Sequence, residues 1–240
     1  MELSQYVTWV KANGERIGEL ATGDLSADVP PCDGWTQADL IAHMTRVFTM
    51  VNGVLETGVR PKRFADLPVG SDIPIFYRDA FDRVMGNLAT TDPTEAKWNW
   101  SVGPQVASFW WRRMAQETAV HRWDAESAVD GCSPIDPELA ADGIDEWFDV
   151  HLRSDLANPE ISGDAAGTIH VHCTDIEGEW WASLVDRNLD LKPVHAKGDV
   201  AIRGNASDLL LVLWGRLPTS TVEVMGDAAV LTSWLELPDI

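Results

Sequence analysis

Glu117 and His121 stand one helical turn apart on a stretch with strong helical periodicity. The neighbouring positions of the same predicted stripe are apolar: Val106, Trp110, Met114, Ala125 and Ala128. Residues four apart share one face of a helix, so this carboxylate and this imidazole point toward the side that packs on other helices. A buried carboxylate without a positive partner is costly. The spacing therefore predicts that a cation meets Glu117.

A third candidate, His43, lies on the predicted stripe of an earlier helix. Its apolar companions on that stripe are Leu40, Val47, Val51 and Val54. Two histidines and one glutamate on the inner faces of packed helices suit Zn²⁺, or Fe²⁺, Mn²⁺ or Ni²⁺. Three protein ligands leave a coordination position open, as in catalytic metal sites. The alternative is a buried Glu–His pair without metal, with His43 satisfied elsewhere in the core.

Two further polar residues bear on this site. Asp124 follows His121 by three positions and could orient a ligand imidazole, or it could form a surface salt bridge with Arg122 or Arg113. Asn13 lies on the stripe of the first predicted helix. It either faces the metal cavity or is a buried amide bonded to backbone.

The elements that must position these residues are helices. We expect them at about Leu3–Ala21, Thr36–Leu55, Ile75–Leu88, Pro104–Val129 and Pro137–Leu156. A Pro- and Gly-containing turn over residues 29–35 precedes the second, and Thr36 with Asp39 forms a near capping box. Residues 56–74 form a long Gly/Pro loop with Arg60, Lys62 and Arg63, typical of a lid or a binding element.

After Asn158 the periodicity changes from helix to strand. Strands are expected at Thr168–Cys173, Trp180–Val185 and Val200–Arg203, and helices at Ala206–Trp214 and Ala228–Leu235. The predicted fold class is therefore α+β. Residues 1–157 form a four-helix bundle, and residues 158–240 form a smaller mixed α/β domain.

Composition excludes several function classes. The net charge of −20, from 38 acidic and 18 basic residues, repels phosphate backbones and excludes nucleic-acid binding. No apolar run reaches the ~18–20 residues of a membrane span, and the N-terminus does not resemble a secretory signal. Three scattered cysteines indicate a reducing compartment rather than a disulfide framework. We expect a cytoplasmic protein, either monomeric or weakly homo-oligomeric.

Three strings resemble one known family. Residues 30–36 (PPCDGWT) with 39–43 (DLIAH) resemble the turn and second helix of the mycothiol-dependent maleylpyruvate isomerase family, which belongs to the DinB-like metal-binding bundles. Residues 109–126 (FWWRRMAQETAVHRWDAE) resemble its central metal helix. Residues 199–216 (DVAIRGNASDLLLVLWGR) resemble its C-terminal domain, which is similar to sterol-carrier-like folds. Asp33 departs from the proline that is usual in this turn, which affects no ligand.

By this resemblance, His43, Glu117 and His121 are zinc ligands and mycothiol, the small cytosolic thiol of actinobacteria, is the cofactor. Zinc would bind the thiol at the open position, lower its pKa and hold it as thiolate. Addition of the thiolate to the cis double bond of maleylpyruvate leaves a single bond that can rotate. Elimination then gives the trans product, fumarylpyruvate, and regenerates the thiol.

Other functions share these residues. A mycothiol S-transferase would begin with the same addition to another electrophile and release the adduct. A small-ligand-binding protein would use the sterol-carrier-like half, and its metal would be structural or vestigial. A hydrolase would use zinc-bound water with Asp124 or another acid as base. The sequence does not identify the small-molecule substrate or the metal.

A dicarboxylate substrate calls for arginine, because the guanidinium group pairs with a carboxylate through two hydrogen bonds. Arg216, after the apolar helix 206–214, is the favoured catalytic candidate over Arg203 and Arg46. The alternative role for Arg216 is to bond the last carbonyls of that helix.

The remaining histidines are expected to be structural. His170 and His172 share one face of a predicted strand, but no third ligand is evident nearby. We therefore interpret them as part of a half-exposed strand face. His151 and His195 are expected at the surface.

Overall fold

The computed structural model describes residues 1–62, 71–129, 131–160 and 167–237. The chain forms two compact units. The bundle unit comprises Met1–Asn99 and Pro104–Ser133, and the sheet unit comprises Trp100–Gly103 and Pro134–Ile240. The predicted fold class is confirmed, with a helical bundle followed by a mixed α/β part. The domain boundary expected between residues 157 and 158 stays a prediction.

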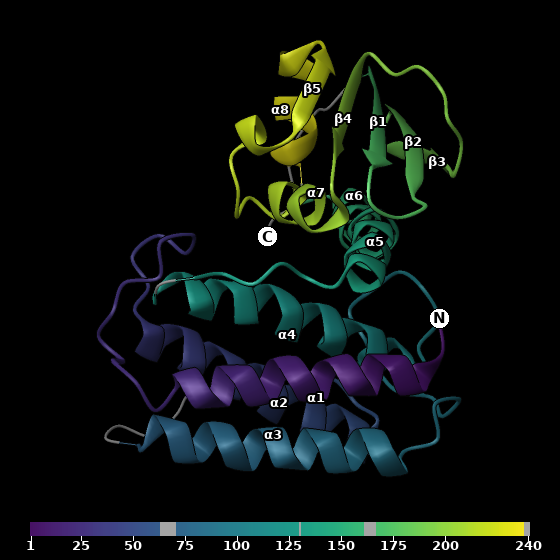
Figure 1. Ribbon diagram of the computed structural model, residues 1–240. Helices are drawn as coiled ribbons and strands as arrows, with labels where there is room; N and C mark the ends of the chain where they lie inside the picture. Colours follow the sequence, from purple (N-terminus) through teal and green to yellow (C-terminus); the bar gives the residue numbers. More distant parts are fainter. Residues whose placement is uncertain (63–70, 130, 161–166, 238–240) are drawn as a thin grey trace. The chain divides into compact units, whose positions relative to one another are not determined.

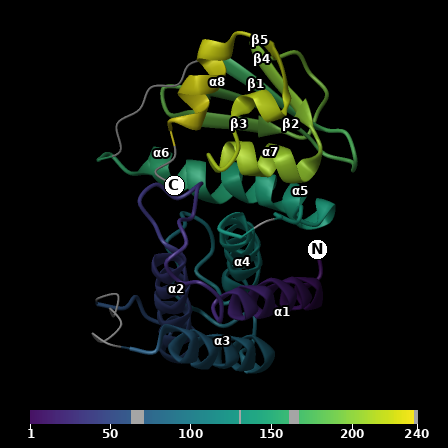
Figure 2. The same cartoon turned by 60° about the vertical axis from the view of Figure 1, so that its left-hand side comes forward.

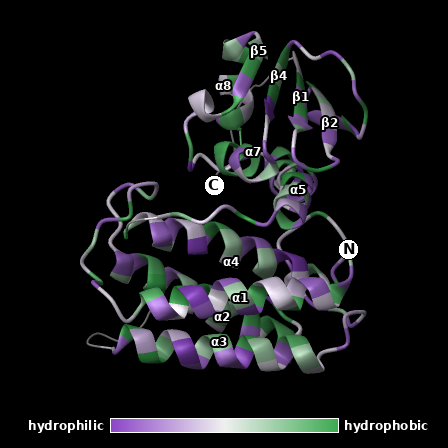
Figure 3. Ribbon diagram, viewed as in Figure 1, coloured by the Kyte–Doolittle hydropathy of each residue, from purple (hydrophilic) through white to green (hydrophobic). Residues whose placement is uncertain are grey.

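The described residues of the bundle unit contain four helices: α1 (Leu3–Leu20), α2 (Gln37–Thr57), α3 (Ile73–Thr90) and α4 (Phe109–Ser127). The main packing pairs are α1 with α4 and α2 with α3, as Figure 1 shows. In Figure 3, α1 and α3 carry both hydrophobic and hydrophilic segments along their length. This pattern is expected of helices with one buried face. No helix in the described ranges combines the length and the hydropathy needed to cross a membrane.

The start of α2 is fixed by its cap. The side chain of Thr36 accepts a hydrogen bond from Asp39 N at 3.3 Å, and Asp39 Oδ2 accepts one from Thr36 N at 2.9 Å. The preceding turn closes on itself, because Val29 N donates to Trp35 O at 2.9 Å. Gly34 occupies a left-handed conformation there (φ 75°), which favours glycine. The predicted capping box is thus confirmed, and it sets the register of the helix that carries His43.

The central helix α4 begins later than predicted. Residues 104–108 were expected in its first turn, but Val106 forms an antiparallel bridge with Ala96, and residues 107–108 form a turn that leads into the helix. Lys97 N donates to Gln105 O at 3.1 Å, and Ala107 N donates to Glu95 O at 2.9 Å. This pairing uses the backbone groups that a first helical turn would otherwise leave to solvent.

In the sheet unit, residues 137–157 form one continuous helical stretch, close to the single helix predicted. It consists of α5 (Pro137–Glu146), a π-helical segment (Trp147–Leu152) and α6 (Arg153–Ala157). The two aromatic residues of the π-helical segment are buried: the ring of Trp147 packs edge-on against Phe148, and Phe148 contacts Trp234. The π-helix is rare and occurs mostly as a single-turn bulge inside an α-helix, which is its place here between α5 and α6.

The sheet has five strands in the described residues: β1 (Gly167–Cys173), β2 (Glu179–Val185), β3 (Asn188–Lys192), β4 (Val200–Gly204) and β5 (Glu223–Gly226). Their order is β3-β2-β1-β4-β5. Only the β1–β4 pair is parallel. The chain returns through α7 (Ala206–Leu213), a 3-10 turn (Thr219–Thr221) and α8 (Ala228–Leu235). The three predicted strands and both predicted helices of this part are present.

The two faces of the sheet differ in what covers them. Buried apolar residues alternate along one face: Ile169, Val171, Cys173, Trp180, Ala182, Leu184, Val200 and Ile202. The helices α7 and α8 contact β1 and β4, and both helices are visible beside the strands in Figure 2. The opposite face carries His170, His172, Glu179 and Trp181, because side chains of a strand alternate with period two.

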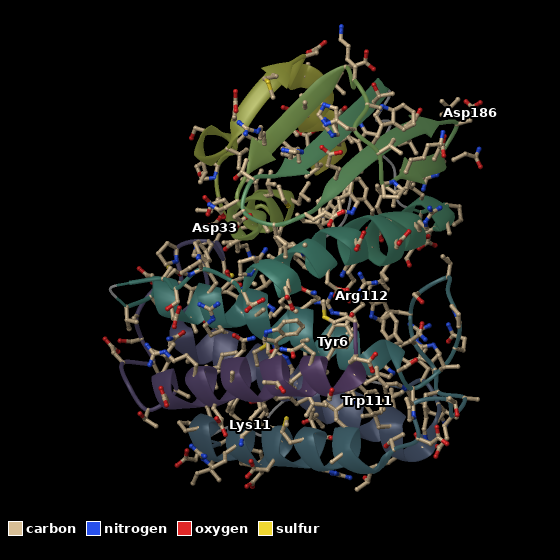
Figure 4. The ribbon with its side chains drawn as sticks, turned by 45° about the vertical axis from the view of Figure 1, so that its right-hand side comes forward. Tyr6, Lys11, Asp33, Trp111, Arg112 and Asp186 are labelled. Carbon is tan, nitrogen blue, oxygen red and sulfur yellow. The ribbon has the colours of Figure 1, made fainter. Side chains whose placement is uncertain are left out.

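Two strands, β3 and β5, were absent from the sequence prediction. β2 and β3 are joined by Asp186 and Arg187, which both have positive φ, 49° and 61°. Two such residues form the turn that suits a hairpin, but the usual Asn-Gly signal is missing. Figure 4 shows Asp186 at the end of this hairpin. β5 is only four residues long and mostly exposed, so its sequence lacks an apolar alternation.

Two glycines provide a matched test of the bundle packing. A Cβ added at Gly14 of α1 would overlap the buried ring of Phe81 on α3, whereas one at Gly53 of α2 meets nothing within 4 Å. We expect Gly14→Ala to lower the free energy of unfolding by about 1–3 kcal/mol through overpacking. Gly53→Ala should raise it by up to about 1 kcal/mol through helix propensity. Urea unfolding measures both, and a Gly14→Ala chain as stable as Gly53→Ala would contradict this packing.

Candidate metal centre

The structure brings His43, Glu117 and His121 together, as the sequence predicted. One ligand atom from each lies within 4.8 Å of the others. Glu117 Oε1 is 3.3 Å from His43 Nε2 and 3.4 Å from His121 Nε2. The two imidazole rings have centroids 4.8 Å apart, in an edge-on arrangement. One carboxylate oxygen and two imidazole nitrogens therefore converge on a common point.

The three side chains differ in exposure. The side chains of Glu117 and His121 are 14% and 9% exposed, whereas that of His43 is 29% exposed. The buried face of α2 differs from the predicted stripe, which contained His43 and Val47. Its fully buried apolar residues are Leu40, Ile41, Met44, Phe48, Val51 and Val54. His43 lies at the edge of this stripe and not in its centre. Solvent therefore has access to the His43 side of the group.

Arg113 supplies a positive partner for the buried carboxylate. It lies one turn before Glu117 on α4, and its Nη2 donates to Glu117 Oε2 at 2.9 Å. The sequence had placed Arg113 only as a possible partner of Asp124. Burial raises the pKa of Glu117, but hydrogen bonds with His121 and His43 and the charges of His121 and Arg113 hold it well below its usual value. Glu117 is therefore an ionised carboxylate at neutral pH.

Asp124 orients His121. Its side chain is fully buried, and Oδ2 lies 2.9 Å from His121 Nδ1. A surface salt bridge, the alternative role, does not fit a carboxylate with no exposed surface. Asp124 accepts the Nδ1 proton, so the other nitrogen, Nε2, faces Glu117. This is the arrangement by which a carboxylate fixes the tautomer of a ligand imidazole.

The orientation of His121 creates a need for a cation. In the neutral ring, Nε2 presents a lone pair toward Glu117 Oε1, which is also an acceptor, and two acceptors repel one another. A proton on Nε2 or a bound metal ion removes this conflict. Burial lowers the pKa of His121, but the bonds to Asp124 and Glu117 outweigh it and raise this pKa to about 9. In the metal-free protein a proton thus occupies the position that a metal ion would take.

Trp35 is a neighbour of the group that the sequence analysis did not single out. Its ring centroid lies 5.2 Å from that of His43. Trp35 packs against a small buried cluster of Val29, Leu40 and Ala125. It is the last residue of the turn before the α2 cap, so the same turn positions both the helix and this indole. Trp35 covers one side of the most exposed member of the group.

Asn13 neither faces the metal cavity nor bonds to backbone, which were its two predicted roles. It belongs instead to a network of charged side chains. Its Oδ1 accepts a hydrogen bond from Arg122 Nε at 3.3 Å. Arg122 Nη1 also donates to Glu126 Oε2 at 2.8 Å, and Glu126 Oε1 accepts from Arg16 Nε at 3.1 Å. These bonds join α1 to α4 on a side of α4 away from Glu117. Their role is to hold the two helices in register.

The other predicted residues lie elsewhere. Arg216 is in the sheet unit after α7, and its Nη1 donates to Trp214 O at 3.0 Å, the helix-end bond given above as its alternative role. Its role toward a substrate stays a prediction.

The expectation that His151 lies at the surface is wrong, because its side chain is 13% exposed and its ring contacts Trp100 and Trp214. Arg60 lies over the ring of Trp98, while Arg63 of the predicted loop falls outside the described residues.

The raised pKa of His121 predicts proton release on metal binding. At pH 7 the metal-free ring is protonated, since its pKa of about 9 lies above the pH. Zn²⁺ at Nε2 displaces this proton, so binding should release about one proton from His121 at pH 7 and none well above pH 9. Calorimetry in buffers of different ionisation enthalpy measures the release. Asp124→Asn removes the charge that raises this pKa and should reduce the release at pH 7. Equal release from the two proteins would contradict this account.

Two family models match the chain. The model of the mycothiol maleylpyruvate isomerase N-terminal domain matches residues 10–126, and that of the MDMPI C-terminal domain matches residues 138–233. No curated protein matches the sequence.

Solved structures agree with these matches. A crystal structure of the mycothiol-dependent maleylpyruvate isomerase is similar over 99% of this chain and 96% of its own, with a TM-score of 0.59 and 12% sequence identity. A crystal structure of a histidine-to-alanine mutant of that enzyme gives a TM-score of 0.60 at 11% identity, with the same coverage. At this identity the likeness shows the fold, while the family models cover both units. The chain belongs to the mycothiol-dependent maleylpyruvate isomerase family.

Proposed function

We propose that this protein is a metal-dependent enzyme that uses mycothiol to isomerise a small cis-alkene acid, with maleylpyruvate as the first substrate to test. The observation that carries this proposal is the convergence of His43 Nε2, His121 Nε2 and Glu117 Oε1 on one point. Membership of the family supports the thiol and the reaction type. Since mycothiol is a cytosolic thiol, we infer a cytoplasmic location.

The donor set fits a zinc ion. Two imidazole nitrogens and one carboxylate oxygen are ligands that Zn²⁺ accepts, and the lone-pair conflict between His121 and Glu117 is relieved by a cation. Among the described residues, this group of potential ligands has three members. A three-ligand group leaves a coordination position for an outside ligand, which favours a catalytic over a structural metal. A bound zinc ion would lower the pKa of the mycothiol thiol and hold it as thiolate.

The surrounding residues tune the charge and geometry of this group. Arg113 neutralises one oxygen of Glu117, so the other is left to face the two imidazoles. Asp124 holds the His121 ring with Nε2 inward. With two neutral imidazoles and one carboxylate, the ligand set carries a charge of minus one. A divalent ion would then keep a net positive charge, which stabilises a thiolate near it.

The proposed reaction needs a nucleophile that adds and leaves. Bound mycothiol would supply this chemistry: its thiolate sulfur would bond to one carbon of the cis double bond while the π electron pair moved to the adjacent carbonyl oxygen. The former double bond would then be a single bond that can rotate. Return of the electron pair would expel the sulfur and leave the trans alkene. We propose Arg216 as the residue that pairs with a substrate carboxylate.

The hydrolase alternative has less support. It needs a carboxylate free to accept a proton from water, and Asp124 is the sequence candidate for this role. Because Asp124 is fully buried and bonded to His121 Nδ1, it is better suited to orient a ligand. The transferase alternative shares the addition step and differs only in the fate of the sulfur.

Mycothiol binding tests the thiol site. We expect zinc-loaded wild-type protein to bind mycothiol in a calorimetric titration, and metal-free protein to bind it far more weakly. His43→Ala should weaken zinc binding by at least about 100-fold, since even outer-shell changes cost 10–100-fold, and should abolish mycothiol binding. Thr49→Ala, at an exposed position of the same helix, is the matched control and should bind like wild type. Failure of the zinc-loaded wild type to bind mycothiol would refute the proposal.

The fate of the thiol separates isomerase from transferase. With maleylpyruvate in large excess over mycothiol, an isomerase converts all of the substrate and leaves the free thiol concentration unchanged. A transferase stops after one equivalent and consumes the thiol. We expect full conversion, followed by the ultraviolet absorbance of the product, with free thiol measured at the end. Turnover that stops when the thiol is consumed would assign the protein to the transferases.

A further inference from the structure

A second group of potential metal ligands lies on the open face of the sheet. It consists of His170 and His172 from β1, Glu179 from β2, and His195 from the segment between β3 and β4. One ligand atom of each lies within 4.8 Å of the others. The sequence offered no third ligand beside the two strand histidines. The structure supplies two, which corrects the interpretation of a plain strand face.

Strand register explains three of the four positions. His172 pairs directly with Glu179 across the β1–β2 ladder. His170 is two residues before His172, so its side chain points to the same face. The fourth residue, His195, comes from the loop of residues 193–199. Because this loop is far from β1 in the sequence, no local pattern predicts that His195 lies beside the strand histidines.

The contacts within the group converge on Glu179. Its Oε1 lies 2.6 Å from Nδ1 of His172 and 2.6 Å from Nδ1 of His195. The ring of His170 lies 5.0 Å from that of His195, centroid to centroid, and the other two ring pairs are 6.0 and 6.1 Å apart. Two imidazoles therefore contact one carboxylate oxygen, and the third imidazole lies beside them.

His170 points to a missing ligand. The residue is 6% exposed, and its Nε2 is buried with no hydrogen-bond partner among the described residues. A buried polar atom without a partner is costly and calls for an explanation.

The loop that carries His195 is anchored over the sheet. Trp181 Nε1 donates to Lys197 O at 3.2 Å. A Cβ added at Gly198 would lie 3.1 Å from His170 N and 3.1 Å from Thr168 O, so glycine permits this close approach to β1. Asp199 Oδ2 accepts a hydrogen bond from Thr168 N at 2.9 Å. These contacts hold the loop against β2 before Gly198 and against β1 after it, and they bring His195 to the strand histidines.

A pocket of about 840 Å³ opens beside the group. The three histidines contribute to its lining, together with Lys197, Ala201 and Met225. Ions in solution can therefore reach the group directly. Outside the histidines the lining is apolar apart from Lys197, Asp199 and Arg203. Because Asp199 Oδ2 already accepts two hydrogen bonds from Thr168, the imidazoles are the main metal-binding groups in the pocket.

We propose that His170, His172, Glu179 and His195 bind a divalent transition-metal ion, with Zn²⁺ as the first candidate. Three imidazoles and one carboxylate supply the four donors of a tetrahedral zinc site, and the same set accepts Ni²⁺ or Cu²⁺. This centre shares no residue with the group of His43, Glu117 and His121. A bound ion would satisfy His170 and join β1, β2 and the 193–199 loop, and thereby stabilise the sheet unit.

Zinc stoichiometry of the full chain tests this centre. Four proteins are loaded with Zn²⁺, dialysed and analysed for metal per chain: wild type, His43→Ala, His195→Ala and the double variant. His195→Ala is suited to this test because its side chain is 75% exposed and its loss should not disturb folding. We expect two ions in wild type, one in each single variant and none in the double variant. Lys197→Ala, from the same loop, is the matched control and should retain two ions.

The outcomes separate the two centres. If the bundle group binds nothing, wild type and His43→Ala both hold one ion and His195→Ala holds none, which still supports the sheet centre. Equal zinc content in wild type and His195→Ala overturns it. Co²⁺ gives a second readout, because tetrahedral coordination by the sheet group should produce visible absorption bands in His43→Ala that disappear in the double variant. Retention of those bands in the double variant would also overturn the proposal.

Discussion

The bundle unit depends on one buried carboxylate, that of Glu117. Removing a charged carboxylate from water costs several kcal/mol unless partners replace the solvent. Arg113 contacts one oxygen of Glu117, and the imidazoles of His43 and His121 contact the other. A single charge therefore requires compensating side chains on both α4 and α2. Asp124 then has to be buried as well, because only an acceptor at Nδ1 keeps the His121 ring turned inward. The five side chains around this charge, which are those of His43, Arg113, Glu117, His121 and Asp124, thus form one connected set.

Helical periodicity was enough to predict the three members of this set that converge. Glu117 and His121 are four apart, and His43 lies on a helix whose start is marked by the Thr36 cap, so local spacing carried the information. The pairing of Arg113 with Glu117 was not predicted, because rotamer choice on one helix decides which carboxylate an arginine reaches. The start of α4 was misplaced because Val106 pairs with the distant Ala96, a contact without a local signature.

The sheet unit shows the limits of local patterns more clearly. Strands β1, β2 and β4 were predicted from their alternation, whereas β3 and β5 lack it and are defined by pairing with neighbours. The same limit hid His195, since its approach to His170 depends on a loop that crosses the sheet. Family membership could not predict the position of His195 either, because at 12% identity two chains of the same fold differ at most side chains. The fold can thus be predicted from hydrophobic periodicity, whereas a group of side chains from distant segments becomes visible only in the three-dimensional structure.

The two units are interleaved along the chain, because Trp100–Gly103 belongs to the sheet unit although it interrupts the bundle sequence. Trp100 packs against His151, with ring centroids 4.8 Å apart, and Trp214 contacts the same histidine, also at 4.8 Å. A fragment that begins at Pro134 would therefore lack one of the two indoles around this imidazole. Exchange of the whole sheet unit would require three cuts in the gene, after residues 99, 103 and 133, instead of one, so the two units are expected to be inherited together.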